Sequence, residues 1–519
     1  MARSVRQGMD EKTSQNGGTT IGLRALRALT RPVDALPLDM FRVVTGLLIL
    51  VYFLRTFAET ADFSGPEGLL DHRLILEMYW FTEIGIFRDW MGVEWFYAAF
   101  GVAIVCCVPL ILGYRVKLFS LILYVIAVST YRRNFIVMYV DDSIMHLLLF
   151  WMLVMPIGRT LVFGEWLRDR RAAWERWKTV TVPGATVRLF FWNLTLLYLV
   201  AGLWKWTSPM WLDGTALYVV FKLPVSYFSS FWTAGHIPLL KIFNYATLIL
   251  EPIVPLMFVL RRGHWAKYVM LAAFIGLHIG SVATLNIPYA NVACAATAIL
   301  MFREELMEWL RGVYVEPVGS ARFGLSGSVA LFMVAALTLA MISSVSLINW
   351  RTAPRELKAG EIISRENSPQ LVDGRADGLD SVQMTFFGAL WIIGIAQQYQ
   401  LFNWIDHRNY ATHYRVVSNG VEVDPDEMFV RSLRGVLLDF YIHDITWLRV
   451  PPENRRELRK SILQRTAARY CRNAKPVGDV TVHSSFERID PNGGVGEFDN
   501  FVLMIFNCRD EQVLWEVIP

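Results

Sequence analysis

Several ionisable side chains lie inside or at the ends of long apolar segments, where a charge is costly and a functional role is the first hypothesis. Lys205 stands between Trp204 and Trp206 in the segment LYLVAGLWKWTSPMWLDGTALY. Dry, aromatic surroundings would disfavour the charged amine and could make it a base at neutral pH. The alternative is an interfacial lysine that extends its amine to water beside a tryptophan belt. The residue chemistry alone favours this alternative.

Three further positions could take part in proton transfer. Asp142 and His146 are spaced i, i+4 and would share a helix face, as either a proton relay or a structural hydrogen-bonded pair. Glu251 precedes Pro252 in the middle of an apolar segment, so this carboxylate needs a partner, either structural or catalytic. His278 has small neighbours, which favours a packing role with one hydrogen bond.

Other polar residues have simpler interpretations. Asp39 and Arg42 are spaced i, i+3 and can form an ion pair at a helix end. Cys471 and Cys508 lie in the polar C-terminal part and could form a disulfide if that part is extracytoplasmic. The five cysteines are too scattered for a metal site, and no phosphate-binding loop, HExxH or CxxC motif is present.

The composition indicates a membrane protein. Of the 519 residues, 54% are hydrophobic and 18% are charged, and the mean hydropathy is +0.36. Soluble domains carry about 25% charged residues. The net charge of +4 is small and scattered, which argues against nucleic-acid binding.

About nine apolar segments are long enough to span a bilayer. Lys and Arg gather before the first segment and in the loops after the second, fourth and sixth, which predicts a cytoplasmic N-terminus and an extracytoplasmic tail. Residues 215–234 suit an interfacial or re-entrant segment, and a tenth span at 384–396 would reverse the side of the tail. The nine segments are 38–58, 95–114, 117–135, 143–163, 187–206, 241–260, 264–285, 287–303 and 326–349.

The predicted fold is an all-α polytopic membrane bundle with a C-terminal soluble α+β domain. The sequence HYRVVSNGVEV predicts a hairpin, residues 452–471 a helix, and two later alternating stretches predict strands. The predicted organisation is a disordered cytoplasmic segment (1–36), the bundle (37–350), a linker with a membrane-associated segment (351–397) and the tail (398–519).

Parts of the chain resemble the HTTM family, the horizontally transferred transmembrane domain related to vitamin K-dependent γ-glutamyl carboxylase. The resemblance covers about 38–310. It rests on MFRVVTGLLIL, on the region 131–159, on the AGLWK…W-x-D-G segment, on the Glu of LILEP and on the His of GLHIG.

The resemblance implies a bundle that works on its non-cytoplasmic side, in a bacterial inner membrane. Lys205 would deprotonate a reduced quinone, which then reacts with oxygen to form an epoxide. The other implied site residues are Asp142, His146, Glu251 and His278 for proton transfer, and Trp204, Trp206 and Trp211 around the quinone.

The sequence departs from the carboxylase in several respects. No segment matches its glutamate- and propeptide-binding regions, and no His closely follows Asn134. Quinol oxidation is therefore a better expectation than glutamate carboxylation. The alternative is a non-catalytic maturation, immunity or scaffold protein that presents its tail to a protein partner. A transporter ranks third, because no inverted repeat is visible.

Overall fold

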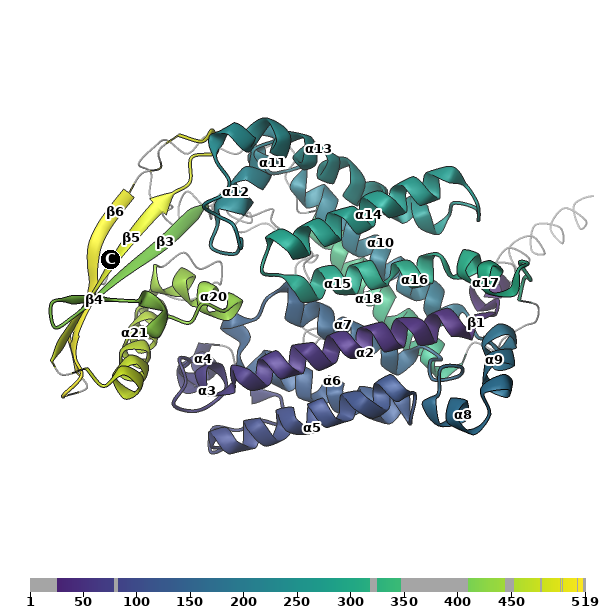
Figure 1. The fold of residues 1–519 in the computed structure, drawn as a ribbon, viewed down its shortest axis with the longest axis horizontal. Helices are drawn as coiled ribbons and strands as arrows, with labels where there is room; N and C mark the ends of the chain where they lie inside the picture. The colour runs from purple at the N-terminus through teal and green to yellow at the C-terminus, as the bar shows by residue number, and fades with distance from the viewer. Residues whose placement is uncertain are drawn as a thin grey trace, which may run out of the picture.

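The computed structural model is a bundle of helices with a twisted sheet at one end (Figure 1). It describes residues 26–78, 83–317, 324–346, 409–443, 452–476, 478–494, 496, 498–510 and 512–516. The predictions for residues 1–22, for the linker 351–397 and for a tenth span at 384–396 lie outside the described residues.

Long apolar helices form the bundle. Five of the described helices have the length and hydropathy to cross a membrane: α2, α5, α10, α13 with its 3-10 extensions, and α14. Their bounds are Ala35–Ala58, Val93–Leu112, Ala185–Lys205, Ile237–Ile253 (within Ala234–Phe258) and Trp265–Thr284.

Each of the other predicted spans also contains a helix, but these helices are shorter, broken or more polar. Helix α6 (Val116–Arg133) ends in two arginines, α7 (Val140–Val154) has 15 residues, and α15 (Pro288–Ala296) is separated from α16 (Ala298–Met301) at Thr297. Helix α18 (Leu325–Ser346) has a shorter apolar part. The structure therefore confirms a helical bundle with five candidate spans, and the count of nine stays a prediction.

Short elements lie at both ends of the bundle (Figure 1). Helices α3, α4, α11 and α12 lie at the end of the bundle that faces the tail, whereas α8, α9 and α17 lie at the opposite end. Helix α12 ends before Pro224, so residues 215–234 form no span, as predicted. The bounds of α3, α4, α11, α12, α8, α9 and α17, in that order, are Thr60–Phe63, His72–Met78, Pro209–Asp213, Ala216–Lys222, Phe163–Arg168, Arg170–Thr179 and Arg303–Arg311.

The tail is an antiparallel sheet covered on one face by helices α20 (Leu433–Ile442) and α21 (Pro452–Ala474). The strand order is β4-β3-β5-β6-β7. The Asn419-Gly420 turn has positive φ at both residues, as a two-residue hairpin requires, and confirms the predicted hairpin. The strands are Tyr410–Ser418, Val421–Val423, Asp479–Arg488, Phe498–Asn507 and Gln512–Glu516 for β3 to β7.

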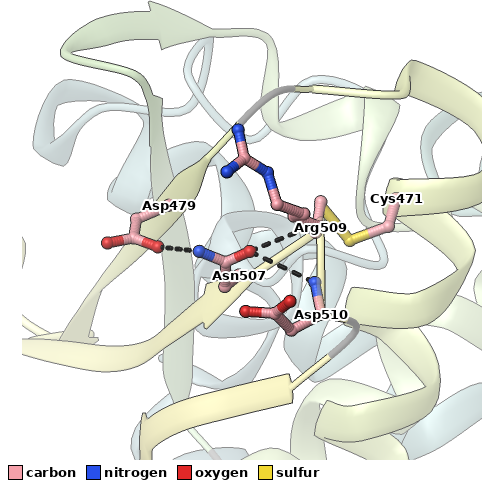
Figure 2. Close-up of a disulfide and its surroundings, with 6 residues drawn as sticks. Cys471, Asp479, Asn507, Arg509 and Asp510 are labelled. Carbon is pink, nitrogen blue, oxygen red and sulfur yellow. Dashed lines mark hydrogen bonds between the residues drawn. A yellow bond between two sulfur atoms is a disulfide. The ribbon is translucent and has the colours of Figure 1, made fainter.

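A disulfide joins the sheet to α21. Cys471 of α21 is bonded to Cys508, which follows β6 (Figure 2). Beside it, Asn507 donates to Asp479 at 2.6 Å and accepts from the backbone N–H groups of Arg509 and Asp510. The pairing that the sequence allowed is therefore present, and it fixes the helix to the strand end.

Candidate functional site

Lys205 lies at the C-terminal end of α10 and is buried, with 1% of its surface exposed. Its Nζ donates a hydrogen bond to Oε2 of Glu251 on α13, at 2.6 Å. The same nitrogen lies 5.3 Å from the centre of the Trp211 ring on α11. An ammonium group between a carboxylate and an indole face is stabilised by both. The structure thus brings together Lys205, Glu251 and Trp211.

The local sequence explains how these three helices meet. A Cβ atom on Gly202 would lie 2.8 Å from Cδ of Pro252, so glycine allows α10 and α13 to approach closely one turn before Lys205. The side chain of Ser208 then caps α11, whose first residue is Pro209. Helix α11 therefore starts immediately after α10 and places its tryptophan over the amine.

The other two predicted quinone-contacting tryptophans behave differently. Trp206 is 49% exposed, and its indole N–H donates to the carbonyl of Leu248 at 3.0 Å. Trp204 packs against the bundle core, and its indole N–H is buried without an acceptor among the described residues. Of the three tryptophans, Trp211 has its ring face next to the Lys205 amine.

His278 belongs to a hydrogen-bonded chain on the same face of α10. Its Nδ1 is 2.8 Å from Oδ1 of Asn291, and its Nε2 is 2.8 Å from the hydroxyl of Tyr198. The side-chain amide N–H of Asn291 donates to the carbonyl of Ile287. The amide oxygen Oδ1 of Asn291 therefore accepts the hydrogen bond from Nδ1 of His278. If the His278 ring is neutral, its Nε2 has no proton and accepts a hydrogen bond from the Tyr198 hydroxyl. Tyr198 precedes Lys205 by two helical turns, which places both on one side of α10.

Asp142 and His146 have different partners, so they form neither of the two arrangements that their spacing allowed, a proton relay or a structural hydrogen-bonded pair. Asp142 accepts from the Tyr52 hydroxyl at 2.7 Å and from Arg434 at 3.1 Å, and it caps α7 through the Tyr139 N–H. The ring of His146 donates from Nε2 to the carbonyl of Ala127 at 3.1 Å. The carboxylate therefore serves a contact between bundle and tail, whereas the histidine packs between helices.

Arg434 of α20 is the tail residue that reaches into the bundle. It is 8% exposed and binds Glu59, just after α2, at 3.1 Å as well as Asp142 at 3.1 Å. Helix α21 adds an ion pair from Arg465 to Asp71, in the loop after α3, and one from Arg469 to Asp62 of α3. The tail is thus docked on the bundle by buried and half-buried charges.

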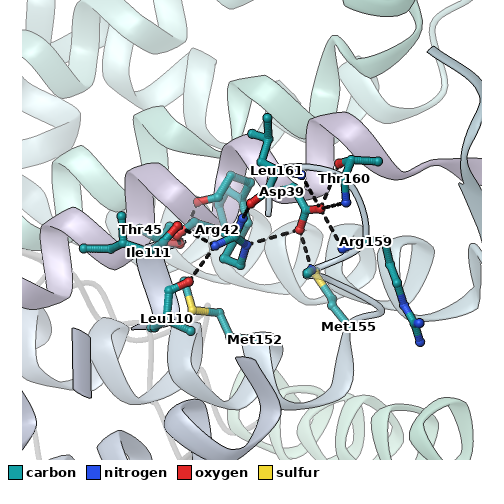
Figure 3. Close-up of polar contacts among 12 residues, drawn as sticks. Asp39, Arg42, Thr45, Leu110, Ile111, Met152, Met155, Arg159, Thr160 and Leu161 are labelled. Atoms are coloured by element: carbon teal, nitrogen blue, oxygen red, sulfur yellow. Dashed lines mark hydrogen bonds and ion pairs between the residues drawn. The ribbon is translucent and has the colours of Figure 1, made fainter. Parts of the chain in front are cut away.

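Two other ionic clusters lie away from Lys205. Lys267 of α14 donates to Glu305 of α17 at 2.7 Å, with its amine 4.5 Å from the Phe302 ring. At the start of α2, Asp39 and Arg42 form the predicted pair at 3.2 Å (Figure 3). The oxygens of Asp39 accept the backbone N–H groups of residues 158–161, and Arg42 donates to three carbonyls. This second cluster holds a loop and is structural.

A half-buried acid in the tail lines a separate cavity. Asp439 of α20 accepts from the Tyr414 hydroxyl at 2.8 Å and from the Thr412 hydroxyl at 3.3 Å. Burial raises the pKa of this carboxyl to about 7, and the two hydroxyl donors oppose the rise. Burial lowers the pKa of nearby His443 to about 4. The adjoining cavity of ≈ 340 Å³ lies between β3, α20 and the loop before α20.

No motif or spacing in the sequence pointed to Tyr52, Arg434 or Asp439 as site residues. Within the described part of the chain, no group of three or more His, Cys, Asp or Glu residues is placed to hold a metal ion. No family model, curated protein or solved structure matches the chain. The assignment of function therefore depends on the geometry and on the sequence resemblance.

Proposed function

We propose that this chain is an integral membrane enzyme that removes a hydroxyl proton from a lipid-soluble quinol, with Lys205 and Glu251 as the proton-accepting pair. The observation that supports this is the burial of the pair beneath Trp211 in an apolar bundle. A planar aromatic ring suits the indole face, and a phenolic hydroxyl is acidic enough for an amine to deprotonate when both are desolvated.

The neighbouring residues have supporting roles in this proposal. Glu251 holds the Lys205 amine in place and shares its proton, so the pair can take up the proton that the quinol releases. The Tyr198–His278–Asn291 chain lies on the same side of α10 and offers a route along which a proton can leave. Dioxygen, the oxidant that the resemblance implies, would react with the resulting quinolate.

The test compares two lysines in similar environments. Purified protein in lipid nanodiscs is given a reduced naphthoquinone and oxygen, and quinol consumption is followed by absorbance. We expect Lys205→Ala to reduce turnover at least 100-fold, the lower range for losing an acid–base group. Lys267→Ala is the matched control, because it also removes a buried lysine paired with glutamate and an aromatic ring.

Both variants should remain folded, as judged by their elution and melting behaviour. Turnover that is equal in Lys205→Ala and in wild type would refute the enzyme proposal, as would equal losses in both lysine variants. The first result leaves Lys205 as a structural cation, and the second attributes the loss to general destabilisation.

The membrane topology belongs to the same proposal. Nine spans with a cytoplasmic N-terminus would place the tail outside the cytoplasm of a bacterial inner membrane. The Cys471–Cys508 disulfide supports this side, because disulfides persist in oxidising compartments and are rare in the cytosol. Labelling of a cysteine introduced in the β3–β4 turn by an impermeant maleimide on intact spheroplasts tests the placement.

A second candidate function is a non-catalytic scaffold that presents its tail to a protein partner. It is favoured by the charged docking of the tail on the bundle through Arg434 and α21, which would hold a partner-binding surface in one orientation above the membrane. Turnover in the quinol assay distinguishes the two, since a scaffold would show none.

A further inference from the structure

One edge of strand β3 is only partly covered. Strand β4 pairs with β3 over residues 416–418, although β3 itself extends from Tyr410 to Ser418. On its other side β3 pairs with β5 along its whole length, without a bulge. The N-terminal half of β3 therefore has a neighbouring strand on one side.

The hydrogen-bond register shows which backbone groups face the uncovered side. At the two ends of the β3–β5 ladder, Ile489 N–H donates to the carbonyl of Asn409 and Asn419 N–H donates to the carbonyl of Asp479. In an antiparallel pair, every second residue of a strand forms its backbone hydrogen bonds with the partner strand. The backbone N–H and C=O groups of the odd-numbered residues of β3 therefore face β5. The N–H and C=O groups of Thr412 and Tyr414 consequently point to the uncovered edge. They have no backbone partner there among the described residues.

A cavity adjoins this edge. Its lining includes Thr412, His413 and Tyr414. Thr412 and Tyr414 point to the same face of β3, where both hydroxyls reach Asp439, and His413 between them also borders the cavity, so the cavity extends to the backbone of β3. The cavity of ≈ 340 Å³ is closed on its other sides by Phe429 of the preceding loop and by Asp439 of α20, among others.

The charges around the cavity indicate what would enter it. Asp439 has hydroxyl donors but no cationic partner within the described part of the chain. The other carboxylate in the lining, Asp426, is already paired with Arg431. A half-buried carboxylate without a cation is incompletely solvated, and an incoming ammonium or guanidinium group compensates for the lost solvation.

We propose that the uncovered edge of β3 binds an extended peptide segment as an added strand, with one lysine or arginine side chain of that peptide inserted beside Asp439. The backbone groups of Thr412 and Tyr414 supply the main-chain hydrogen bonds, and the cavity supplies the selectivity for a basic residue. This site is separate from Lys205 and does not depend on the proton transfer proposed there.

The test is a selection from a library of random short peptides on the full-length protein in nanodiscs. Wild type should select peptides enriched in Lys or Arg at one position, and Asp439→Asn should lose that enrichment and bind the selected peptides at least tenfold more weakly. The isosteric asparagine can accept from the Tyr414 hydroxyl at its amide oxygen and donate its amide N–H to the Thr412 hydroxyl, so both contacts are kept. Glu422→Gln is the control, because Glu422 is an exposed carboxylate of β4 outside the cavity lining, and it should change binding less than twofold.

Backbone readouts separate strand addition from other binding modes. In the selected peptide, N-methylation of one alternate set of amides should abolish binding, and methylation of the other set should be tolerated. Hydrogen exchange should slow in the segment that contains β3 when the peptide binds. Lys205→Ala should select the same peptides, so failure of the enzyme proposal leaves this result unchanged.

Three results would overturn the proposal. One is a selection that yields no basic preference, and another is a preference that survives in Asp439→Asn. The third is slowed exchange in β3 that depends only on protein concentration, which would identify a second copy of the chain as the occupant of the edge.

Discussion

Arg434→Ala should weaken the attachment of the tail to the bundle more than any substitution of an exposed arginine. The wild-type guanidinium binds Asp142 and Glu59, each at 3.1 Å, and is 8% exposed. Glu59 keeps a second cation, Arg55, at 3.2 Å, but Asp142 has no second ion pair within the part of the chain that the structure describes. Loss of one partner from a buried pair costs about 3–5 kcal/mol, because it leaves an uncompensated charge. We expect a loss in this range for Arg434→Ala.

The assay is thermal unfolding of the purified protein in detergent, followed by limited proteolysis to report release of the tail. Arg415→Ala is the control, because Arg415 and its partner Glu422 are both 62% exposed and such pairs contribute about 0–1 kcal/mol. Asp142→Asn in the Arg434→Ala background should recover part of the lost stability, because it removes the negative charge that Arg434 no longer compensates. Equal melting temperatures for Arg434→Ala and Arg415→Ala, with unchanged proteolysis, would refute this account.

Two further predictions concern the tail. Burial favours the protonated form of Asp439, with a pKa of about 7, and the neutral form of His443, with a pKa of about 4. The contribution of Asp439 to the free energy of unfolding is largest below pH 4 and decreases as the pH rises to 7. The contribution of His443 is largest above pH 6.5 and decreases as the pH falls to 4. The opposing slopes, roughly 1.4 kcal/mol per pH unit each, should nearly cancel in wild type. Asp439→Asn should therefore gain stability with rising pH and His443→Gln should lose it, as measured by unfolding at pH 4 to 6.5; parallel profiles would contradict this. Separately, Cys471→Ser with Cys508→Ser should destabilise the tail by about 2–4 kcal/mol, and an unchanged melting temperature on reduction would argue against a structural bond.

Local sequence patterns were sufficient for much of the tail. An Asn-Gly pair between alternating segments specifies a two-residue hairpin, and Asn419 and Gly420 adopt the positive φ angles that this turn requires. Helix α21 and the later strands follow their sequence periods in the same way. In each case the physical cause lies within a few residues along the chain, which is why the sequence alone was informative.

The partners of the candidate site residues could not be predicted in this way. Lys205 and Glu251 are 46 positions apart, and Arg434 and Asp142 are 292 apart. The i, i+4 spacing of Asp142 and His146 suggested a contact that is not formed, because the Asp142 carboxylate accepts a hydrogen bond from Tyr52 of a neighbouring helix. A hydrogen bond across helices depends on helix packing, and packing depends on residues such as Gly202 that carry no chemical signal of their own.

What the sequence did establish is that partners must exist, since an ionisable group in an apolar segment is stable only when it is paired. Asp39, Lys205, Glu251 and His278 all have such partners. For this reason pairing alone cannot distinguish a catalytic lysine from a structural one. Lys267 illustrates this, because it is buried against Glu305 and Phe302 in nearly the same chemistry. Lys205 differs in the Tyr198–His278 chain along its helix face, so only a comparison of turnover between these two lysines can separate catalysis from the general cost of removing a buried ion pair.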